Sequence, residues 1–355
     1  MILTVKMLRK KYTAIDLFCG AGGLTAGLKK AGFDVLAGVE FSAVAAETYK
    51  LNNRKAKVYL KDICELSPNE LMRDMQLQPG DLDLLAGCPP CQGFSSHQTR
   101  NKAISLTDKR NDLIFEFIRY VEVMLPKTVM LENVPALAKD WRISVLKDCL
   151  LNLGYHIDES FAQIKDAADY GVPQRRKRLL IKASRFGAIE DAIPVKKRKT
   201  VADAIFGMAR PGESGDPLHD FPTSRSEKVQ KIISLVPKNG GSRTALPEIY
   251  WLDCHRRRPE SYRDVYGRMT WEDVSPTITS GCTNPSKGRF IHPQEDRPIT
   301  LREAALLQTF PASYKFSTSR GKEAVALMIG NALPPEFIRK QAVQYMTHLK
   351  GIMHE

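Results

Sequence analysis

Short apolar runs alternate with amphipathic stretches in the first half of the chain, from Tyr12 to about Arg185. This alternation is typical of parallel strands joined by crossover helices. The predicted strands are Thr13–Leu17, Val35–Val39, Leu82–Leu85, Thr128–Leu131 and Leu179–Lys182. Apolar residues three or four positions apart predict covering helices at Leu24–Ala31, Ala43–Leu51, Asp112–Met124 and Ile143–Leu153. The first half is therefore predicted to form an open α/β domain.

The pattern changes after Arg185, where periodicity weakens and prolines and glycines cluster in 209–222 and 236–242. These features predict a separate, smaller and loop-rich module. Helical spacing returns at Leu301–Gln308 and at Pro335–Leu349, and the latter suits a terminal helix packed on the first domain. The predicted domains are residues 1–184, completed by 323–355, and residues 185–322, which include a hinge.

The composition narrows the class of protein further. The 355 residues carry a formal net charge of +13, which attracts polyanions but does not separate DNA from RNA or from an acidic protein. Seven cysteines spread through the chain are an odd number and do not indicate a disulfide framework. Because no signal peptide or apolar stretch long enough to cross a membrane is found, we expect a cytoplasmic protein without membrane association.

A glycine-rich turn, Asp16–Gly23, follows the first predicted strand and leads directly into a helix. Small residues allow a ligand to approach the backbone, and amides at a helix start bind its polar groups. The spacing differs from the G-x-G-x-x-G fingerprint and no P-loop lysine follows, so the turn favours neither NAD nor ATP. A tight turn without a ligand remains an alternative.

Two acidic residues follow the turn at successive strand ends. Glu40 ends the second strand, where its carboxylate can accept hydrogen bonds from a ribose diol. Asp62, followed by Ile63, comes after the short apolar pair Val58 and Tyr59, in a position to meet the exocyclic amine of an adenine. Taken singly, both acids would be solvated loop residues, but in this order they indicate an adenosine-type ligand.

A cysteine loop, Gly87–Ser95, follows the apolar run that ends the third predicted strand. Pro89 and Pro90 make the approach rigid, and Cys91 lies just beyond a strand end, at the edge where open α/β sheets bind ligands. Cys91 is thus placed like a nucleophile. Residues 92–110 are polar and basic, and too long for a simple connection, which predicts a mobile loop that closes over a substrate.

Other interpretations of this loop remain open. Cys88 and Cys91 have the spacing of a redox pair or of half a zinc site, but a redox motif should open a helix, which the two prolines and Gly93 oppose. No second cysteine or histidine pair at zinc-ligand spacing occurs, so we expect no metal. An inert structural cysteine is a further alternative.

Three charged residues are further candidates for a role at the active site. Glu132 ends a buried strand, where desolvation raises the pKa of a carboxyl group and allows it to share a proton with a ring nitrogen. Arg176 and Arg178 alternate before the last predicted strand and so point to one face, available to hold a phosphate or a carbonyl oxygen. A basic run of this kind is otherwise a solvated surface.

In their joint order, these blocks resemble the DNA (cytosine-5)-methyltransferases of restriction–modification systems. The resemblance spans nearly the whole chain. The matching blocks are Asp16–Gly23, Glu40, Asp62, Pro90–Gln92, Glu132–Val134, Gln174–Arg178, Arg297–Ala304 and Ile329–Pro335. It implies an S-adenosylmethionine-dependent methyltransferase fold, which is a Rossmann-like, mostly parallel sheet with a second, smaller, loop-rich target-recognition domain.

The resemblance also implies a role for each matching residue. S-adenosylmethionine is the implied cofactor, without a metal, and Asn331 resembles the residue that completes its pocket from the C-terminus. The implied cofactor-binding residues are Asp16, Phe18, Gly20, Gly22, Glu40, Asp62, Ile63, Pro90 and Asn331. The implied catalytic residues are the nucleophile Cys91, the ring-binding Glu132, and the supporting pair Arg176 and Arg178.

The implied reaction transfers a methyl group to carbon 5 of a cytosine that is flipped out of double-stranded DNA. An RNA branch of the family is an alternative, but it tends to have a shorter recognition region than the roughly 115 residues between Arg185 and Thr300. A catalytically silent DNA-binding protein would not need Cys91, Glu132 and Asn331 together. We expect a bacterial, cytoplasmic, nucleoid-associated monomer, with a possible cognate restriction endonuclease that acts on the same site.

Overall fold

The computed structural model describes residues 11–90, 112–257 and 262–352. Its centre is a seven-stranded sheet with the order β3-β2-β1-β4-β5-β7-β6. The strands are β1 (Thr13–Leu17), β2 (Asp34–Glu40), β3 (Lys57–Leu60), β4 (Leu84–Gly87), β5 (Thr128–Asn133), β6 (Ala162–Asp166) and β7 (Lys177–Ser184). Neighbouring strands from β3 to β5 run parallel, whereas β7 is antiparallel to both β5 and β6. The predicted α/β class with a mostly parallel sheet is confirmed.

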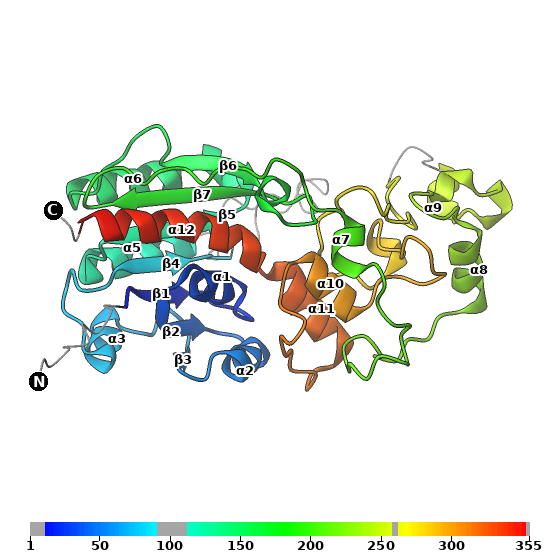
Figure 1. The fold of residues 1–355 in the computed structure, drawn as a ribbon, viewed down its shortest axis with the longest axis horizontal. Helices are drawn as coiled ribbons and strands as arrows, with labels where there is room; N and C mark the ends of the chain where they lie inside the picture. Colours follow the sequence, from blue (N-terminus) through cyan, green and yellow to red (C-terminus); the bar gives the residue numbers. More distant parts are fainter. Residues whose placement is uncertain (1–10, 91–111, 258–261, 353–355) are drawn as a thin grey trace, which may run out of the picture.

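Helices bury both faces of this sheet, which explains its near-continuous apolar strands. The helices of the first half are α1 (Gly23–Ala31), α2 (Ala43–Asn52), α3 (Pro68–Met75), α5 (Leu113–Met124) and α6 (Trp141–Asn152). The chain returns from its far end as α12 (Pro335–Ile352), which packs beside α1 on one face (Figure 1). The other face carries α3, α5 and α6, whose apolar side chains share one core with β1 and β5.

The approach of α1 and α12 is unusually close because of one glycine. A Cβ atom on Gly27 of α1 would lie 2.5 Å from the Cβ of Ile338 on α12. Any larger residue at position 27 would therefore push the two helices apart. Leu24, Leu28 and Phe337 fill the rest of this contact with β1 and β4.

The second part of the chain lies beside the sheet domain and consists of short helices joined by long loops (Figure 1). Its helices are α7 (Val201–Ile205), α8 (Glu227–Leu235), α9 (Asp253–Arg257), α10 (Leu301–Leu307) and α11 (Gly321–Asn331). Short 3₁₀ turns occur in the two parts at Pro135–Lys139, Ala167–Tyr170, Arg243–Ala245, Glu248–Tyr250 and Pro285–Lys287. The largest apolar cluster of this part includes Ala21 and Ala45 of the sheet domain, so the two parts share a core.

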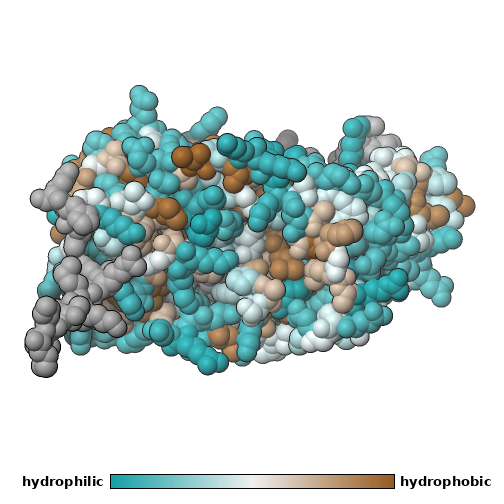
Figure 2. All heavy atoms as spheres, in the orientation of Figure 1, coloured by the Kyte–Doolittle hydropathy of each residue, from teal (hydrophilic) through white to brown (hydrophobic). Residues whose placement is uncertain are grey.

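Hydrophilic side chains cover most of the face shown in Figure 2, and apolar side chains form only small scattered groups there. Within the described ranges, no helix has the length and apolar character needed to cross a membrane.

The predicted elements agree with the structure except for a few short or polar segments. The sequence pattern named no strand at β3 or β6 and no helix at α3, α7, α8, α9 or α11, and the strand predicted to begin at Leu82 begins two residues later, at Leu84. At the sheet edge, β6 has the sequence Ala-Gln-Ile-Lys-Asp, in which Ile164 is 52% exposed and Lys165 is buried. Such a strand carries no apolar alternation that a sequence pattern can detect.

Candidate active site

The glycine-rich turn joins β1 to α1 in an uncommon backbone conformation. Phe18, Gly20 and Gly22 have φ angles of 63°, 54° and 91°. A Cβ atom on Gly20 would meet nothing within 4 Å, whereas one on Gly22 would lie 2.6 Å from the hydroxyl oxygen of Tyr314. Gly20 therefore borders open space in which a ligand can approach the backbone, and Gly22 is required by packing.

Glu40 is fixed beside this turn at the end of β2. Its Oε2 accepts a hydrogen bond from the Gly20 amide (2.8 Å), and its Oε1 accepts one from the Ser42 amide (2.7 Å). Burial raises the pKa of the Glu40 carboxyl group, although these amides partly oppose the shift. Each carboxylate oxygen keeps a second lone pair, so the held carboxylate can still accept hydroxyl donors.

Asp16 lies beneath the turn, completely buried at 0% exposure. Its Oδ2 accepts from the Thr25 amide (3.1 Å) and hydroxyl (2.6 Å), whereas its Oδ1 has no hydrogen-bond partner among the described residues. Burial raises the pKa of Asp16 to about 7, with the Thr25 bonds opposing. An unpaired buried acceptor beside a permissive turn fits a ligand that brings positive charge or hydrogen-bond donors.

Asp62 and Ile63 lie just beyond β3, next to the end of β2. The Lys61 amide donates to the Glu40 carbonyl (3.2 Å), which keeps the two strand ends together. Asp62 Oδ1 accepts from the Cys64 amide (2.9 Å), and buried Ile63 gives its carbonyl to Arg119 Nη2 (2.7 Å). The structure therefore brings Glu40 and Asp62 to the same edge of the sheet.

Phe41 is a candidate that the sequence pattern missed. Its side chain is 76% exposed although it directly follows Glu40 at the strand end. A large exposed aromatic ring next to Glu40 provides a surface on which a purine can stack. The available signal was an aromatic residue immediately after a predicted strand end.

The described part of the cysteine loop is tied to β5. Asn133 Nδ2 donates to the Pro89 carbonyl (3.0 Å), and the Cys88 thiol donates to Glu132 Oε2 (2.8 Å). Pro90 is exposed, and Cys91 lies outside the described residues. These contacts direct the chain from β4 across the end of β5, toward the buried carboxyl group of Glu132.

Glu132 is 1% exposed and is held between a thiol and a guanidinium group. Arg178 Nε lies 2.8 Å from Glu132 Oε1 and forms an ion pair with it. The geometry is not that of a hydrogen bond, so Oε1 has no hydrogen-bond partner among the described residues. Burial raises the pKa of Glu132, and the charge of Arg178 and the Cys88 hydrogen bond oppose the shift. The raised pKa lets the side chain take up a proton more readily than an ordinary glutamate does.

Arg176 and Arg178 occupy different surroundings, although both influence Glu132. Buried Arg176 donates to the carbonyls of Ile278 (3.0 Å) and Gly330 (2.9 Å), and so joins the sheet to the second part of the chain. Burial and the neighbouring Arg178 lower the pKa of Arg176 to about 9. Because β7 runs antiparallel to β5, its start lies at the same edge as the end of β5.

Asn331 ends α11 and is exposed next to the start of α1. A Cβ atom on Gly330 would lie 2.3 Å from the Ser280 amide nitrogen, and one on Gly23 would lie 2.4 Å from the Leu333 carbonyl. The close approach at Gly23 brings the segment that follows Asn331 against the end of the glycine-rich turn, whereas the approach at Gly330 packs α11 against residues 279–280. The C-terminal block thus borders the same edge as Glu40.

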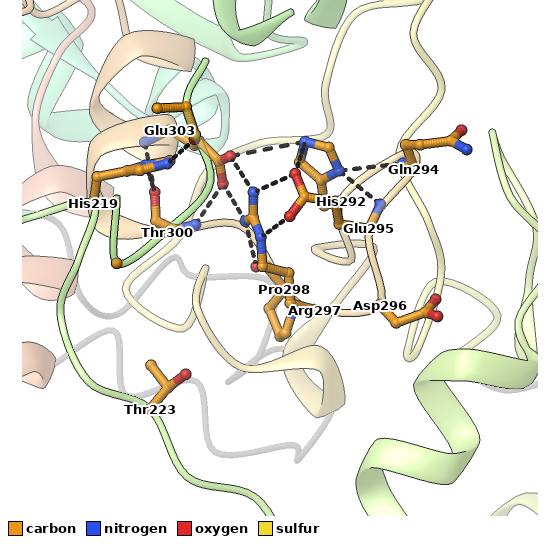
Figure 3. Close-up of polar contacts among 12 residues, drawn as sticks. His219, Thr223, His292, Gln294, Glu295, Asp296, Arg297, Pro298, Thr300 and Glu303 are labelled. Atoms are coloured by element: carbon orange, nitrogen blue, oxygen red, sulfur yellow. Dashed lines mark hydrogen bonds and ion pairs between the residues drawn. The ribbon is translucent and has the colours of Figure 1, made fainter. Parts of the chain in front are cut away.

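The remaining block, Arg297–Ala304, forms a polar network within the second part (Figure 3). Arg297 donates two hydrogen bonds to the completely buried Glu303, at 2.8 and 2.7 Å. Thr300 and Glu303 cap the start of α10 reciprocally, which is the geometry of a capping box. The hydrogen bonds of this block run to residues of the second part, so the block supports that part.

Comparisons with known proteins agree with this arrangement. A sequence profile for C-5 cytosine-specific DNA methylases matches residues 12–346. The chain is 38% identical to the type II methylase M.HgiDII of Herpetosiphon aurantiacus, over 96% of each chain. It is 34% identical to the type II methyltransferase M.PspPI of a Psychrobacter species, over 92% of this chain and 76% of that protein.

Two solved structures share the fold. A putative DNA modification methyltransferase encoded within an E. coli prophage matches with a TM-score of 0.72 and 24% identity, over 97% of this chain and 100% of that one. The S. pombe Dnmt2 methyltransferase matches with a TM-score of 0.58 and 16% identity, over 96% and 99%. The profile that spans nearly the whole chain and the 38% identical type II methylase show that the protein belongs to the C-5 cytosine-specific DNA methylase family and is a DNA (cytosine-5-)-methyltransferase.

Proposed function

We propose that the protein transfers a methyl group from S-adenosylmethionine to carbon 5 of a cytosine in a specific double-stranded DNA sequence. The observation that carries this proposal is the convergence of the site at one sheet edge. The glycine-rich turn, Glu40, Asp62 and Glu132 follow or end β1, β2, β3 and β5, whose carboxyl ends lie together. Ligands of open α/β sheets bind at this edge.

The residues around the turn fit S-adenosylmethionine, which supplies an electrophilic methyl group on a sulfonium centre when it is bound. Glu40 would accept hydrogen bonds from the ribose hydroxyls, and Asp62 and Ile63 would contact the adenine, with the exposed Phe41 ring beside it. The turn residues Phe18, Gly20 and Gly22, with Asp16 beneath them, would surround the methionine part. Pro90 and Asn331 would close the pocket from the two neighbouring segments.

Glu132 would hold the edge of the cytosine ring. With its raised pKa it can donate a proton to ring nitrogen 3 and accept from the exocyclic amine, while the Cys88 thiol holds Oε2 and Arg178 forms an ion pair with Oε1. Protonation of that edge draws electrons from the ring and makes carbon 6 electrophilic. Arg178 would also support the target nucleotide, whereas Arg176 would act through the backbone that it holds.

Cys91 would be the nucleophile. Its thiolate adds to carbon 6, and the electron pair of the carbon 5–carbon 6 double bond becomes available at carbon 5 for methylation. Removal of the proton from carbon 5 then restores the double bond and expels the thiolate. Because a stacked cytosine exposes neither ring face, it must first leave the duplex, at a cost of a few kcal/mol that contacts to the base and backbone offset.

Residues 185–322, which make up most of the second part of the chain, would recognise the DNA sequence, and the net charge of +13 favours binding to the phosphate backbone. The relatives in Herpetosiphon and Psychrobacter are named as type II enzymes, which supports a role in restriction–modification. We accordingly infer a monomeric enzyme of the bacterial cytoplasm that protects DNA from a cognate endonuclease.

The test uses duplex DNA that contains 5-fluorocytosine, together with radiolabelled S-adenosylmethionine. Fluorine on carbon 5 blocks the final elimination, so the proposal predicts a labelled protein–DNA adduct that survives denaturation. Cys91→Ser should form no adduct while it still binds the cofactor. Cys149→Ser is the matched control, since Cys149 lies on α6 and contacts Glu122 rather than the site.

Three results would contradict parts of the proposal. An adduct that persists in Cys91→Ser would remove Cys91 as the nucleophile. Methylation of tRNA but not of DNA, tested in parallel, would favour the RNA substrate. Binding of DNA without methyl transfer to either nucleic acid would favour a silent DNA-binding protein.

A further inference from the structure

The glycine-rich turn is anchored by hydrogen bonds to different elements. The Cys19 amide donates to the Val39 carbonyl (2.9 Å), so the backbone of β2 holds the start of the turn. The Gly22 amide donates back to the Cys19 carbonyl (2.9 Å). The carbonyl of Ala21 accepts a hydrogen bond of 2.6 Å from the hydroxyl of Tyr314, which lies in the second part of the chain. The turn is thus anchored from both parts of the molecule.

The Tyr314 contact is buried and tightly packed. Tyr314 is 6% exposed and Ala21 is 4% exposed, so water has little access to the bond between them. The Tyr314 hydroxyl also lies against Gly22, where a Cβ atom would come within 2.6 Å of its oxygen. Burial raises the pKa of the Tyr314 phenol, so the hydroxyl stays protonated and remains a donor.

The second part fixes the position of Tyr314. Its ring packs against Phe310, at 4.7 Å between ring centroids, and against Phe316, at 5.4 Å. Its backbone carbonyl accepts from Arg302 Nη1 (3.1 Å), and the same guanidinium group forms an ion pair with Asp216. The tyrosine is therefore held by the core of the second part rather than by the turn that it contacts.

The residues that follow Tyr314 continue along α2. The Lys315 amide donates to Asn52 Oδ1 (3.0 Å), and the Ser317 amide donates to Thr48 Oγ1 (2.9 Å). Asn52 Nδ2 returns a hydrogen bond to the Lys315 carbonyl (2.8 Å). The segment that carries Tyr314 is thereby aligned with the helix that follows Glu40.

The turn needs such support because its backbone is intrinsically unfavourable. A non-glycine residue with positive φ, such as Phe18, is sparsely populated and persists when its surroundings hold it. Without the Tyr314 hydroxyl, the buried Ala21 carbonyl would lose its partner and the turn could relax. Ligand binding would then have to restore the original shape at a cost in affinity.

We propose that Tyr314 is a positioning residue for the cofactor, whose hydroxyl holds the glycine-rich turn in the shape that receives S-adenosylmethionine. Affinity for the cofactor then depends on the second part of the chain, although that part is expected to read DNA. The inference rests on the proposed use of S-adenosylmethionine at this turn.

The experiment compares full-length wild-type protein with Tyr314→Phe by calorimetric titration with S-adenosylmethionine and by single-turnover methylation at saturating cofactor. The variant loses one hydroxyl and keeps the ring that packs on Phe310. We expect the dissociation constant to rise about fivefold, as for the loss of one buried hydrogen bond. The single-turnover rate constant at saturation should stay unchanged, because Tyr314 would not touch the reacting atoms.

Tyr155→Phe is the matched control. Tyr155 is 3% exposed, and its hydroxyl donates to the Pro126 carbonyl (2.5 Å), before the amino end of β5 and away from the turn. It should lose stability in thermal unfolding but bind the cofactor like wild type. Wild-type affinity in Tyr314→Phe, or an equal loss of affinity in both variants, would overturn the positioning role. A wild-type protein that binds no S-adenosylmethionine would instead contradict the cofactor assignment itself.

Discussion

Two buried acids, one in each part of the molecule, show opposite electrostatic behaviour. Glu132, at the sheet edge, is 1% exposed, and Glu303, on α10, is 0% exposed. Burial raises the pKa of Glu132, and its neighbours only partly oppose the shift. Burial acts on Glu303 in the same direction, but hydrogen bonds and charge from Arg297 outweigh it, so the pKa of Glu303 is lowered.

The difference lies in how completely each carboxylate is paired. Glu303 accepts two bonds from Arg297 and one from the Thr300 amide (2.7 Å) (Figure 3). Among the described residues, Glu132 has the Cys88 thiol on one oxygen and, on the other, an ion pair with Arg178 that is not a hydrogen bond. A fully paired buried charge stabilises a fold, whereas an incompletely paired one is available for proton transfer.

The largest effect is expected for Glu132→Gln. Glutamine has nearly the same shape but cannot carry the proton, so we expect methyl transfer to slow by about a hundredfold or more, the usual worth of a positioned proton donor. The fold should be retained, because the change removes a desolvated carboxyl group. Single-turnover methylation and thermal unfolding of the same preparation separate the two effects. A variant with normal turnover would show that Glu132 has no role in proton transfer.

Glu303→Gln should reduce the stability of the protein rather than the rate of methyl transfer. It breaks a buried ion pair and leaves Arg297 without its main partner, so we expect the free energy of unfolding to fall by about 3 kcal/mol. Urea denaturation measures this loss. The rate of methyl transfer at saturating substrates, measured well below the unfolding temperature, should change little.

Glu295→Gln provides the control for that variant. Glu295 also pairs with Arg297, at 2.9 Å, but its side chain is 36% exposed. Exposed pairs contribute less than about 1 kcal/mol, so this substitution should cost much less than Glu303→Gln. Equal losses in the two variants would show that burial and pairing of Glu303 are not what distinguishes it.

Asp16 is a further buried acid, and its raised pKa predicts how stability depends on pH. Its pKa is raised to about 7 in the folded protein from the usual 3.8, so the folded state binds a proton more tightly than the unfolded state. Stability should therefore fall as pH rises between these values and level off above pH 7. Asp16→Asn, which stays neutral, should gain stability relative to wild type by up to about 1.4 kcal/mol per pH unit across this window.

Urea unfolding of wild type and Asp16→Asn at pH 5, 6, 7 and 8 measures the difference between their free energies of unfolding. Contributions from other titrating groups cancel in this difference. A constant difference across this range would contradict the raised pKa of Asp16. Asp16 and Glu132, the two buried acids at this edge of the sheet, would then not share a raised pKa.

The sequence predicted those elements whose burial follows a simple period. The bounds of β1 agree residue by residue with the prediction, because both of its faces are buried and its apolar run is continuous. The polar edge strand β6 was missed, since only Lys165 among its residues is buried. In the second part the core depends on contacts between distant loops, for which no local periodicity exists.

The candidate site was predictable where it depends on strand ends. Glu40 and Glu132 were placed correctly at one edge because parallel strands bring their carboxyl ends together. Arg176 donates to the backbone carbonyls of Ile278 and Gly330, which lie more than 100 positions away in the sequence. Because these partners are backbone atoms, the residue types at positions 278 and 330 do not reveal the contact. The hydrogen bond from Tyr314 to the Ala21 carbonyl was equally unpredictable. Every residue has a backbone carbonyl, so the sequence does not indicate which one a distant hydroxyl will reach.

The most direct test of the central claim uses duplex DNA that carries tritium on carbon 5 of its cytosines. Methylation at carbon 5 must displace the hydrogen there, so we predict that S-adenosylmethionine-dependent methyl transfer releases one tritium into water for each methyl group that enters labelled cytosine. Cys91→Ser should release none. Methyl transfer to those cytosines without release of tritium would contradict the claim, because the methyl group would then be attached to another atom.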